Sequence, residues 1–125
     1  MPPPPYDPLD ATVTVATFDA APKQKQRLVR QHWMEQVEGA GAPATYFLTT
    51  ERVVLGRSES ADIQVNSVKA SRQHALIERS GVDYILRDND SRNGVYLNGL
   101  RIHSAVLREA DTVQVTDCVF IYHEP

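Results

Sequence analysis

A chain of 125 residues has room for one domain and some additional chain, and its 42% hydrophobic and 23% charged residues are typical of a soluble globular protein. The net charge of −3 argues against general nucleic-acid binding, which needs an excess of basic residues. A single cysteine, Cys118, excludes an internal disulfide and a cysteine zinc cluster, and the absence of a membrane-spanning apolar run or a signal-peptide pattern makes the cytoplasm the expected compartment.

The first 21 residues are rich in proline and threonine. The four consecutive prolines at residues 2–5 favour an extended conformation without internal hydrogen bonds. The run DATVTVATFD, residues 10–19, alternates threonine with valine or alanine as a strand would, but a lone strand has no core to cover. We therefore expect residues 1–21 to be a flexible tail.

The next segment has apolar side chains at helical spacing. Val29, Trp33 and Val37 recur every four residues, and a proline and a glycine suit the start and the end of a helix. The charges oppose the helix dipole, because the basic residues come first and the glutamates last. This pattern predicts a marginal amphipathic helix over residues 22–38, with Trp33 docked on another surface. The sequence GAGAP, residues 39–43, then predicts a flexible linker.

From residue 44 onward the pattern changes to short β-rich runs. ATYFLT, RVVLG, HALIER, VDYILRD and CVFIYH are typical of strands, and turn-forming groups such as SES, SG and DNDSRNG separate them. No helical pattern follows Gly39. About 80 residues of closely spaced short strands predict one all-β sandwich domain over residues 44–125.

Three polar loops interrupt these strands, at residues 56–62, 66–74 and 88–94. Arginine, lysine and serine side chains within them are the donors that a phosphate dianion accepts hydrogen bonds from. If the loops converge, they form a cationic anion-binding rim. If Glu59, Asp62, Asp88 and Asp90 pair with the arginines instead, the loops form an ordinary solvated surface. The residues alone leave both interpretations open.

An ordered set of short motifs resembles the forkhead-associated (FHA) phosphothreonine-binding domains over about residues 45–123. The motifs are GR at 56–57, SRQH at 71–74 and SRNGVYLNG at 91–99, followed by a closing strand pair. Each piece alone is common, but their order and separation are specific. The resemblance implies an 11-stranded β-sandwich with an N-terminal extension, and loops at one end that bind a phosphothreonine peptide without catalysis, cofactor or metal.

The resemblance also implies roles for individual loop residues. Arg57 matches the arginine that binds phosphate, Ser71 matches the serine whose hydroxyl binds a phosphate oxygen, and Asn93 matches the asparagine that holds the peptide backbone. The full implied phosphothreonine-binding set is Arg57, Lys69, Ser71, Arg72, Arg92 and Asn93. The implied structural residues are Gly56, His74, Gly94 and Asn98, with His74 buried and hydrogen-bonded across the loops. Val95, where a threonine is common, is the main departure.

Ser71 and His74 do not indicate an enzyme, because neither a nucleophile elbow nor an orienting carboxylate accompanies them. The tail threonines Thr12, Thr14 and Thr17 are candidate phosphosites for a Ser/Thr protein kinase, as in several bacterial FHA proteins whose tails bind their own domain. About 30 residues of coil span roughly 30 Å, which suffices for such binding. The alternative is a tail without this role, or one that belongs to a longer protein.

Two functional classes stay open. In the first, the domain binds a phosphothreonine-containing partner or its own phosphorylated tail, as an adaptor or as the sensory domain of a larger signalling enzyme such as a nucleotide cyclase. In the second, the β-sandwich is a structural or dimerising module with an unused phosphate pocket, and the helix carrying Trp33 provides the contact surface.

Overall fold

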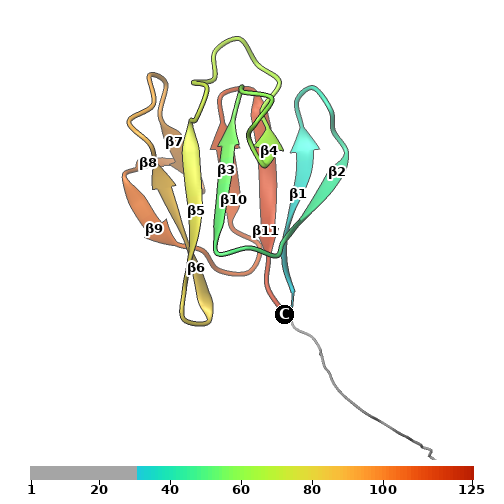
Figure 1. The fold of residues 1–125 in the computed structure, drawn as a ribbon, viewed down its shortest axis with the longest axis vertical. Coiled ribbons are helices and arrows are strands. Elements are labelled where there is room, and N and C mark those ends of the chain that lie inside the picture. The colour runs from blue at the N-terminus through green and yellow to red at the C-terminus, as the bar shows by residue number, and fades with distance from the viewer. Residues whose placement is uncertain (1–30) are drawn as a thin grey trace, which may run out of the picture. The chain divides into compact units, whose positions relative to one another are not determined.

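The computed structural model describes residues 31–125, which form a sandwich of two β-sheets (Figure 1). This part of the chain contains eleven strands and no helix, which confirms the predicted 11-stranded all-β fold. The strands are β1 (His32–Glu38), β2 (Ala44–Leu48), β3 (Arg52–Gly56), β4 (Ile63–Gln64), β5 (Ala75–Ser80), β6 (Asp83–Asp88), β7 (Val95–Leu97), β8 (Leu100–Ile102), β9 (Ser104–Val106), β10 (Thr112–Val115) and β11 (Cys118–His123). No helix long and apolar enough to cross a bilayer occurs between residues 31 and 125.

The topology places the polar loops at one end of the sandwich. The six-stranded sheet has the order β2-β1-β11-β10-β7-β8, and the five-stranded sheet has the order β4-β3-β5-β6-β9. The connections β3–β4, β4–β5 and β6–β7 all emerge at the upper end in Figure 1, whereas the β5–β6 hairpin lies at the lower end. We call these the loop end and the hairpin end.

The core between the sheets follows from the period-two alternation of the strands. In β11, Cys118, Phe120 and Tyr122 are buried and the residues between them are partly exposed. Met34 of β1 and Leu86 of β6 meet this row as fully buried side chains. Burying each large apolar side chain contributes about 1.5–3 kcal/mol, so this shared core holds the strand ends, and with them the loops, in place.

Residues 32–38 form strand β1, so the predicted helix over residues 22–38 is wrong for this part. A spacing of four residues fits both periods, because Trp33 and Val37 share one face of a strand as well as one face of a helix. Met34 and Gln36 are both buried and lie two residues apart, which is the side-chain period of a strand. β1 pairs with both β2 and β11, which a helix cannot do. The rest of the predicted helix and the tail, including residues 1–21, lie outside the described residues.

Residues 39–43 form the tight β1–β2 turn and not a flexible linker. Gly39 has a positive φ of 98°, and a Cβ there would lie 2.8 Å from the carbonyl oxygen of Asp117 and from Cys118 Sγ. The side chain of Gln36 donates a hydrogen bond of 3.0 Å to the carbonyl of Ala40. The turn is therefore packed onto the β10–β11 connection, and the sandwich includes β1, so it does not start at residue 44.

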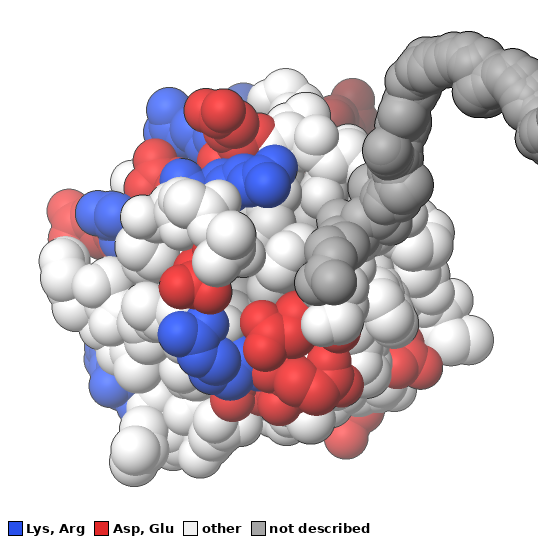
Figure 2. Space-filling model, turned by 90° about the horizontal axis from the view of Figure 1, so that it is seen from below, with Lys and Arg blue, Asp and Glu red and all other residues white. Residues whose placement is uncertain are grey.

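At the hairpin end, His123 joins three segments of the chain. Its Nδ1 lies 2.9 Å from Glu109 and its Nε2 lies 3.2 Å from Glu35 of β1, while its ring stacks on Trp33 at a centroid distance of 4.9 Å. Acidic side chains gather on this end of the molecule, with basic ones beside them (Figure 2). The hydrogen bond to Glu109, supported by Glu35, raises the pKa of His123 above its ordinary value of 6.5 despite the opposing effect of burial.

We predict that His123 stabilises the fold most at low pH. Its pKa is raised in the folded state, so its contribution is fully present below the unfolded pKa and is lost as pH rises through the folded pKa. His32 acts in the opposite sense, because burial lowers its pKa and its protonation opposes folding. The wild type should exceed His123→Gln in unfolding free energy by more at about pH 5.5 than at about pH 8.5, as measured by urea titration. A difference that does not change with pH contradicts the prediction.

Candidate functional site

The three polar loops meet around one hollow at the loop end, of about 750 Å³. All six residues of the predicted binding set line it, together with two residues that the sequence did not indicate. The lining residues are Arg57, Val68, Lys69, Ala70, Ser71, Arg72, Arg92 and Asn93. We call this space the loop-end hollow. The sequence left open whether these side chains converge, and the structure brings them together.

Backbone hydrogen bonds attach the β4–β5 loop to the end of β3. The amide of Arg57 donates to the carbonyl of Ser71 at 3.0 Å, and the amide of Ser58 donates to the carbonyl of Arg72 at 3.1 Å. Gly56 permits this approach, because a Cβ at that position would lie 2.1 Å from the Arg72 carbonyl oxygen. Any larger residue would separate the two segments, so Gly56 sets the distance between Arg57 and Ser71.

The guanidinium of Arg57 is oriented by a neutral partner. Its Nε donates a hydrogen bond of 3.0 Å to the carbonyl of Ala70. No ion pair within residues 31–125 involves Arg57, Arg72 or Arg92. The terminal nitrogens of Arg57 therefore keep their donors for an anion in the hollow.

The β6–β7 loop is tied to the β4–β5 loop through polar side chains. Ser71 Oγ accepts a hydrogen bond of 3.3 Å from the amide of Arg92, which leaves the hydroxyl proton of Ser71 available to donate. Asn93 Nδ2 donates to the carbonyl of Lys69 at 2.7 Å. Ser71 and Asn93, two of the six residues that the resemblance assigned to ligand binding, thus connect the two loops.

His74 lies buried beneath the hollow and connects the same two loops. Its Nδ1 accepts a hydrogen bond of 3.0 Å from the amide of Ser71, so the proton is on Nε2, which donates to the carbonyl of Gly94 at 2.8 Å. The ring has no exposed surface. Both ring nitrogens are therefore occupied by backbone groups, as expected of a structural residue.

The β6–β7 loop has its own internal support. Ser91 Oγ accepts from the amide of Gly94 at 2.9 Å, and the amide of Ser91 donates to Asp88 at 3.1 Å. Gly94 has a positive φ of 84°, and a Cβ there would lie 2.5 Å from Arg101 Nε. The loop therefore turns tightly at a position that only glycine suits. Nothing in the sequence indicates that Arg101 covers this turn.

Asn98 lies away from the hollow, in the β7–β8 turn. It has a positive φ of 51°, and Gly99 follows with 85°, as an Asn-Gly turn requires. Its side chain accepts from the amide of Thr112 at 2.8 Å and donates to Asp111 at 3.0 Å. Asn98 thereby holds the β7–β8 hairpin against the start of β10.

Two of the four acidic loop residues are engaged with backbone amides, and none of the four forms an ion pair with an arginine in the described chain. Asp62 accepts from the amide of Val54 at 2.8 Å, and Asp88 accepts from the amide of Ser91. Lys69 lies 3.8 Å from Asp117 of the β10–β11 turn, which the sequence did not indicate, and both side chains are mostly exposed. Such an exposed pair contributes little, so Lys69 can exchange Asp117 for another anion at small cost.

Known proteins match the part of the chain that contains the hollow. The FHA domain family model matches residues 53–116. The transcriptional regulatory protein EmbR of Mycobacterium tuberculosis is 32% identical over 112 residues, which cover 89% of this chain and 27% of EmbR. The oxoglutarate dehydrogenase inhibitor of Corynebacterium jeikeium is 35% identical over 77 residues, which cover 62% of this chain and 54% of the inhibitor. The chain thus spans between about a quarter and about half of these relatives.

A solved structure resembles the chain in the same region. It is M. tuberculosis EmbR in complex with a low-affinity phosphopeptide, with 26% identity and a TM-score of 0.69. The match covers 74% of this chain and 24% of that one.

We predict that His74→Ala destabilises the domain by about 2–5 kcal/mol, because it leaves the Ser71 amide and the Gly94 carbonyl without partners and opens a cavity. His103→Ala is the matched control, since His103 is exposed, and should change stability by less than about 0.5 kcal/mol. Denaturant unfolding measures both. Equal stability of the two variants would show that the bridge between the loops is not needed.

Proposed function

The chain belongs to the FHA domain family, and from this membership we propose that residues 31–125 bind a phosphothreonine peptide in the loop-end hollow. One observation carries the proposal: Arg57 and Ser71, from separate loops, line one hollow, and no carboxylate of the described chain neutralises Arg57. The complex of the related EmbR with a phosphopeptide supports the same ligand class.

The phosphate contacts follow from the donors in the hollow. The terminal nitrogens of Arg57 bind two phosphate oxygens, and the hydroxyl of Ser71 binds the third. Lys69 leaves Asp117 and adds an ammonium group. Each charge-assisted hydrogen bond contributes about 1.5–3 kcal/mol, so two or three such bonds with peptide contacts give micromolar affinity. The side chain of Asn93 then contacts the peptide backbone.

The proposed role is binding and not catalysis. A serine nucleophile needs a general base with a free ring nitrogen within reach. Both nitrogens of His74 are engaged, by the Ser71 amide and the Gly94 carbonyl. The pair of residues that looks like a catalytic fragment in the sequence is thus better suited to hold the anion site rigid.

The first test is the loss of phosphate-dependent binding in Arg57→Ala. Its affinity for a phosphothreonine peptide should fall about 10- to 100-fold, because about 1.5–3 kcal/mol of charge-assisted bonding is removed. Arg79→Ala is the matched control: Arg79 also donates Nε to a carbonyl, that of Gly81, but beside the β5–β6 hairpin. Calorimetric titration with phosphorylated and unphosphorylated peptides measures both variants. Equal affinity for the two peptides would contradict the proposal.

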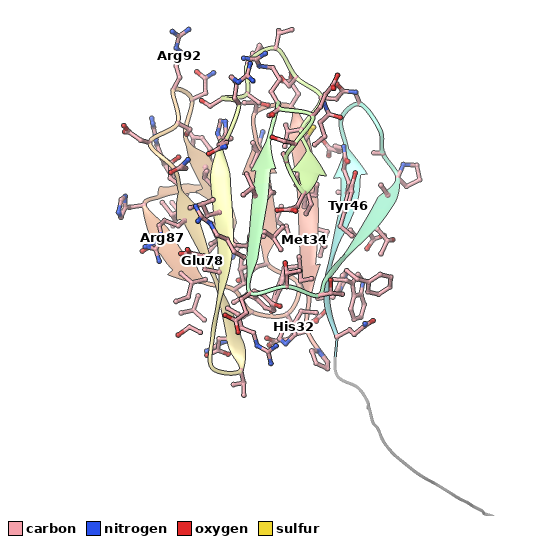
Figure 3. All side chains as sticks on the ribbon, in the orientation of Figure 1. His32, Met34, Tyr46, Glu78, Arg87 and Arg92 are labelled. Carbon is pink, nitrogen blue, oxygen red and sulfur yellow. The ribbon has the colours of Figure 1, made fainter. Side chains whose placement is uncertain are left out.

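We further propose that the hollow binds the chain's own tail after a Ser/Thr kinase modifies Thr12, Thr14 or Thr17. His32, the first residue of β1, lies at the hairpin end, and Arg92 lies at the loop end (Figure 3). About 20 residues separate Thr12 from His32, and they span roughly 25 Å as a coil and over 60 Å when extended. The extended length is enough to cross a sandwich whose longest strand has seven residues. Tethering raises the effective concentration to about the millimolar range, which fills even a weak site.

Phosphorylation of the purified chain tests this self-binding. The amide signals of Ser71, Arg92 and Asn93 should shift in an NMR spectrum, at positions that do not depend on protein concentration. Affinity for an added phosphothreonine peptide should fall at the same time, because the site is already filled. A triple Thr→Ala variant at residues 12, 14 and 17 is the control. Unchanged signals in the phosphorylated chain would exclude tail binding.

The wider role belongs to the same proposal. A phosphothreonine-binding domain serves a cytoplasmic kinase signalling pathway as an adaptor or as the sensory part of a longer enzyme. EmbR, of which the match covers 27%, is an example of a relative in which such a domain is one part of a longer protein. The alternative is a structural or dimerising module. It is favoured by Trp33 and Phe47, neighbours on adjacent strands with ring centroids 6.4 Å apart, of which Phe47 is 56% exposed.

A further inference from the structure

We propose that the uncharged segment ATVTVATF, residues 11–18, adds to the six-stranded sheet as a further strand along the open edge of β2. The segment lies outside the described residues, and the proposal gives it a place in the unmodified chain. The pairing uses no phosphate, so it depends neither on the loop-end hollow nor on the proposed function.

β2 is the longest of the four edge strands in the described part of the chain. It has five residues, whereas β4 has two and β8 and β9 have three each. Within residues 31–125, β2 pairs with β1 and with no other strand. Every second residue of an edge strand directs its amide and carbonyl away from the sheet, where they can pair with another strand. β2 therefore offers a template for one more strand.

The sequence of β2 lacks the features that protect exposed edges. Natural edge strands are blunted by charged residues, proline, bulges or short length, but ATYFL has no charge and no proline and pairs with β1 in regular register. Phe47 is 56% exposed beside Trp33 of β1. On the opposite face, Tyr46 is partly buried and packs on the core beside Phe120. A strand added at this edge would cover apolar surface on both faces of the sheet.

Residues 11–18 have the sequence of a strand that lacks a sheet. None of the eight residues is charged, and five are β-branched, which favours extended structure: Thr12, Val13, Thr14, Val15 and Thr17. In an extended strand Val13 and Val15 lie on one side and Phe18 lies on the other. The valine side continues the core-facing row of Tyr46, and Phe18 joins the exposed aromatic row of Phe47, where aromatic cross-strand contacts stabilise a sheet.

The chain leaves the sandwich beside β2. His32 begins β1 and is paired in register with Leu48, the last residue of β2. Thirteen residues, 19–31, connect Phe18 to His32 and extend to over 40 Å, whereas the longest strand, with seven residues, spans about 23 Å. The segment can therefore reach all of β2 in either direction. Tethering gives it an effective concentration of about 1 mM, so a pairing with a Kd of about 0.1–1 mM covers the edge between about half and about nine-tenths of the time.

A paramagnetic label on the segment tests its position in the full chain. Ala16→Cys introduces a thiol for a nitroxide reagent, while Cys118 is buried and protected from it. The NMR amide signals of Thr45 and Phe47 should broaden, and those of β9, an edge of the other sheet, should not. The control is a mixture of labelled chain with isotope-enriched unlabelled chain, which should show no broadening because the pairing lies within one molecule.

Hydrogen exchange tests the pairing without a label. Successive residues of a strand direct their amides to opposite sides, so either Thr14→Pro or Val15→Pro removes an amide that points toward β2. In at least one of these variants, exchange of the β2 amides that face away from β1 should be about two- to tenfold faster than in the wild type, as the predicted coverage requires. Ala20→Pro, outside the segment, is the matched control and should keep the wild-type rates.

Three results would overturn the inference. The first is broadening that is absent from β2, whether it appears at the loop-end hollow or nowhere. The second is broadening of β2 in the mixture, which would place a second copy of the chain at this edge. The third is exchange of the outward β2 amides at wild-type rates in both Thr14→Pro and Val15→Pro. A failure of phosphothreonine binding leaves these readouts unchanged, so the two proposals fail independently.

Discussion

The anion site depends on one buried contact, the imidazole of His74 between the amide of Ser71 and the carbonyl of Gly94. These two backbone groups are 23 residues apart in the sequence, in the loops before β5 and after β6, which extend beyond the last paired residues of these two strands. Without a partner, each would be a buried polar group with a desolvation cost of about 1–3 kcal/mol. The histidine removes this cost and fixes the separation of the loops. Gly56 fixes the distance between the end of β3 and the β4–β5 loop, because it lets Arg57 approach Ser71 closely.

An acidic protein can carry a cationic hollow because several of its carboxylates are engaged by other groups. Asp62 and Asp88 accept backbone amides and so hold the β3–β4 and β6–β7 loops in shape. Glu35 and Glu109 are bound to His123 at the opposite end of the sandwich. The net charge of −3 therefore says little about the local potential at the loops, which is set by where the acids find neutral partners.

The sequence predicts the β-sandwich well, because strand alternation is local, and the six loop residues of the predicted binding set do line one hollow. It fails at β1, because the spacing of Trp33 and Val37 fits a helix and a strand equally and only burial of Met34 and Gln36 distinguishes them. Sequence patterns also do not predict the contact of Lys69 with Asp117, because the two residues are 48 positions apart in the chain. Val68, which is 93% exposed at the rim of the hollow, has no chemical signature in the sequence.

The arginines of the hollow differ in how firmly their side chains are held. Arg57 is held by the carbonyl of Ala70, so its remaining donors are pre-organised for the proposed phosphate. Arg72 and Arg92 have fixed backbones but exposed, unpaired side chains, and must be ordered when they contact a ligand. That ordering costs conformational entropy, which a charge-assisted contact with the ligand must offset. Arg57 therefore loses less entropy on binding an anion than Arg72 or Arg92 does.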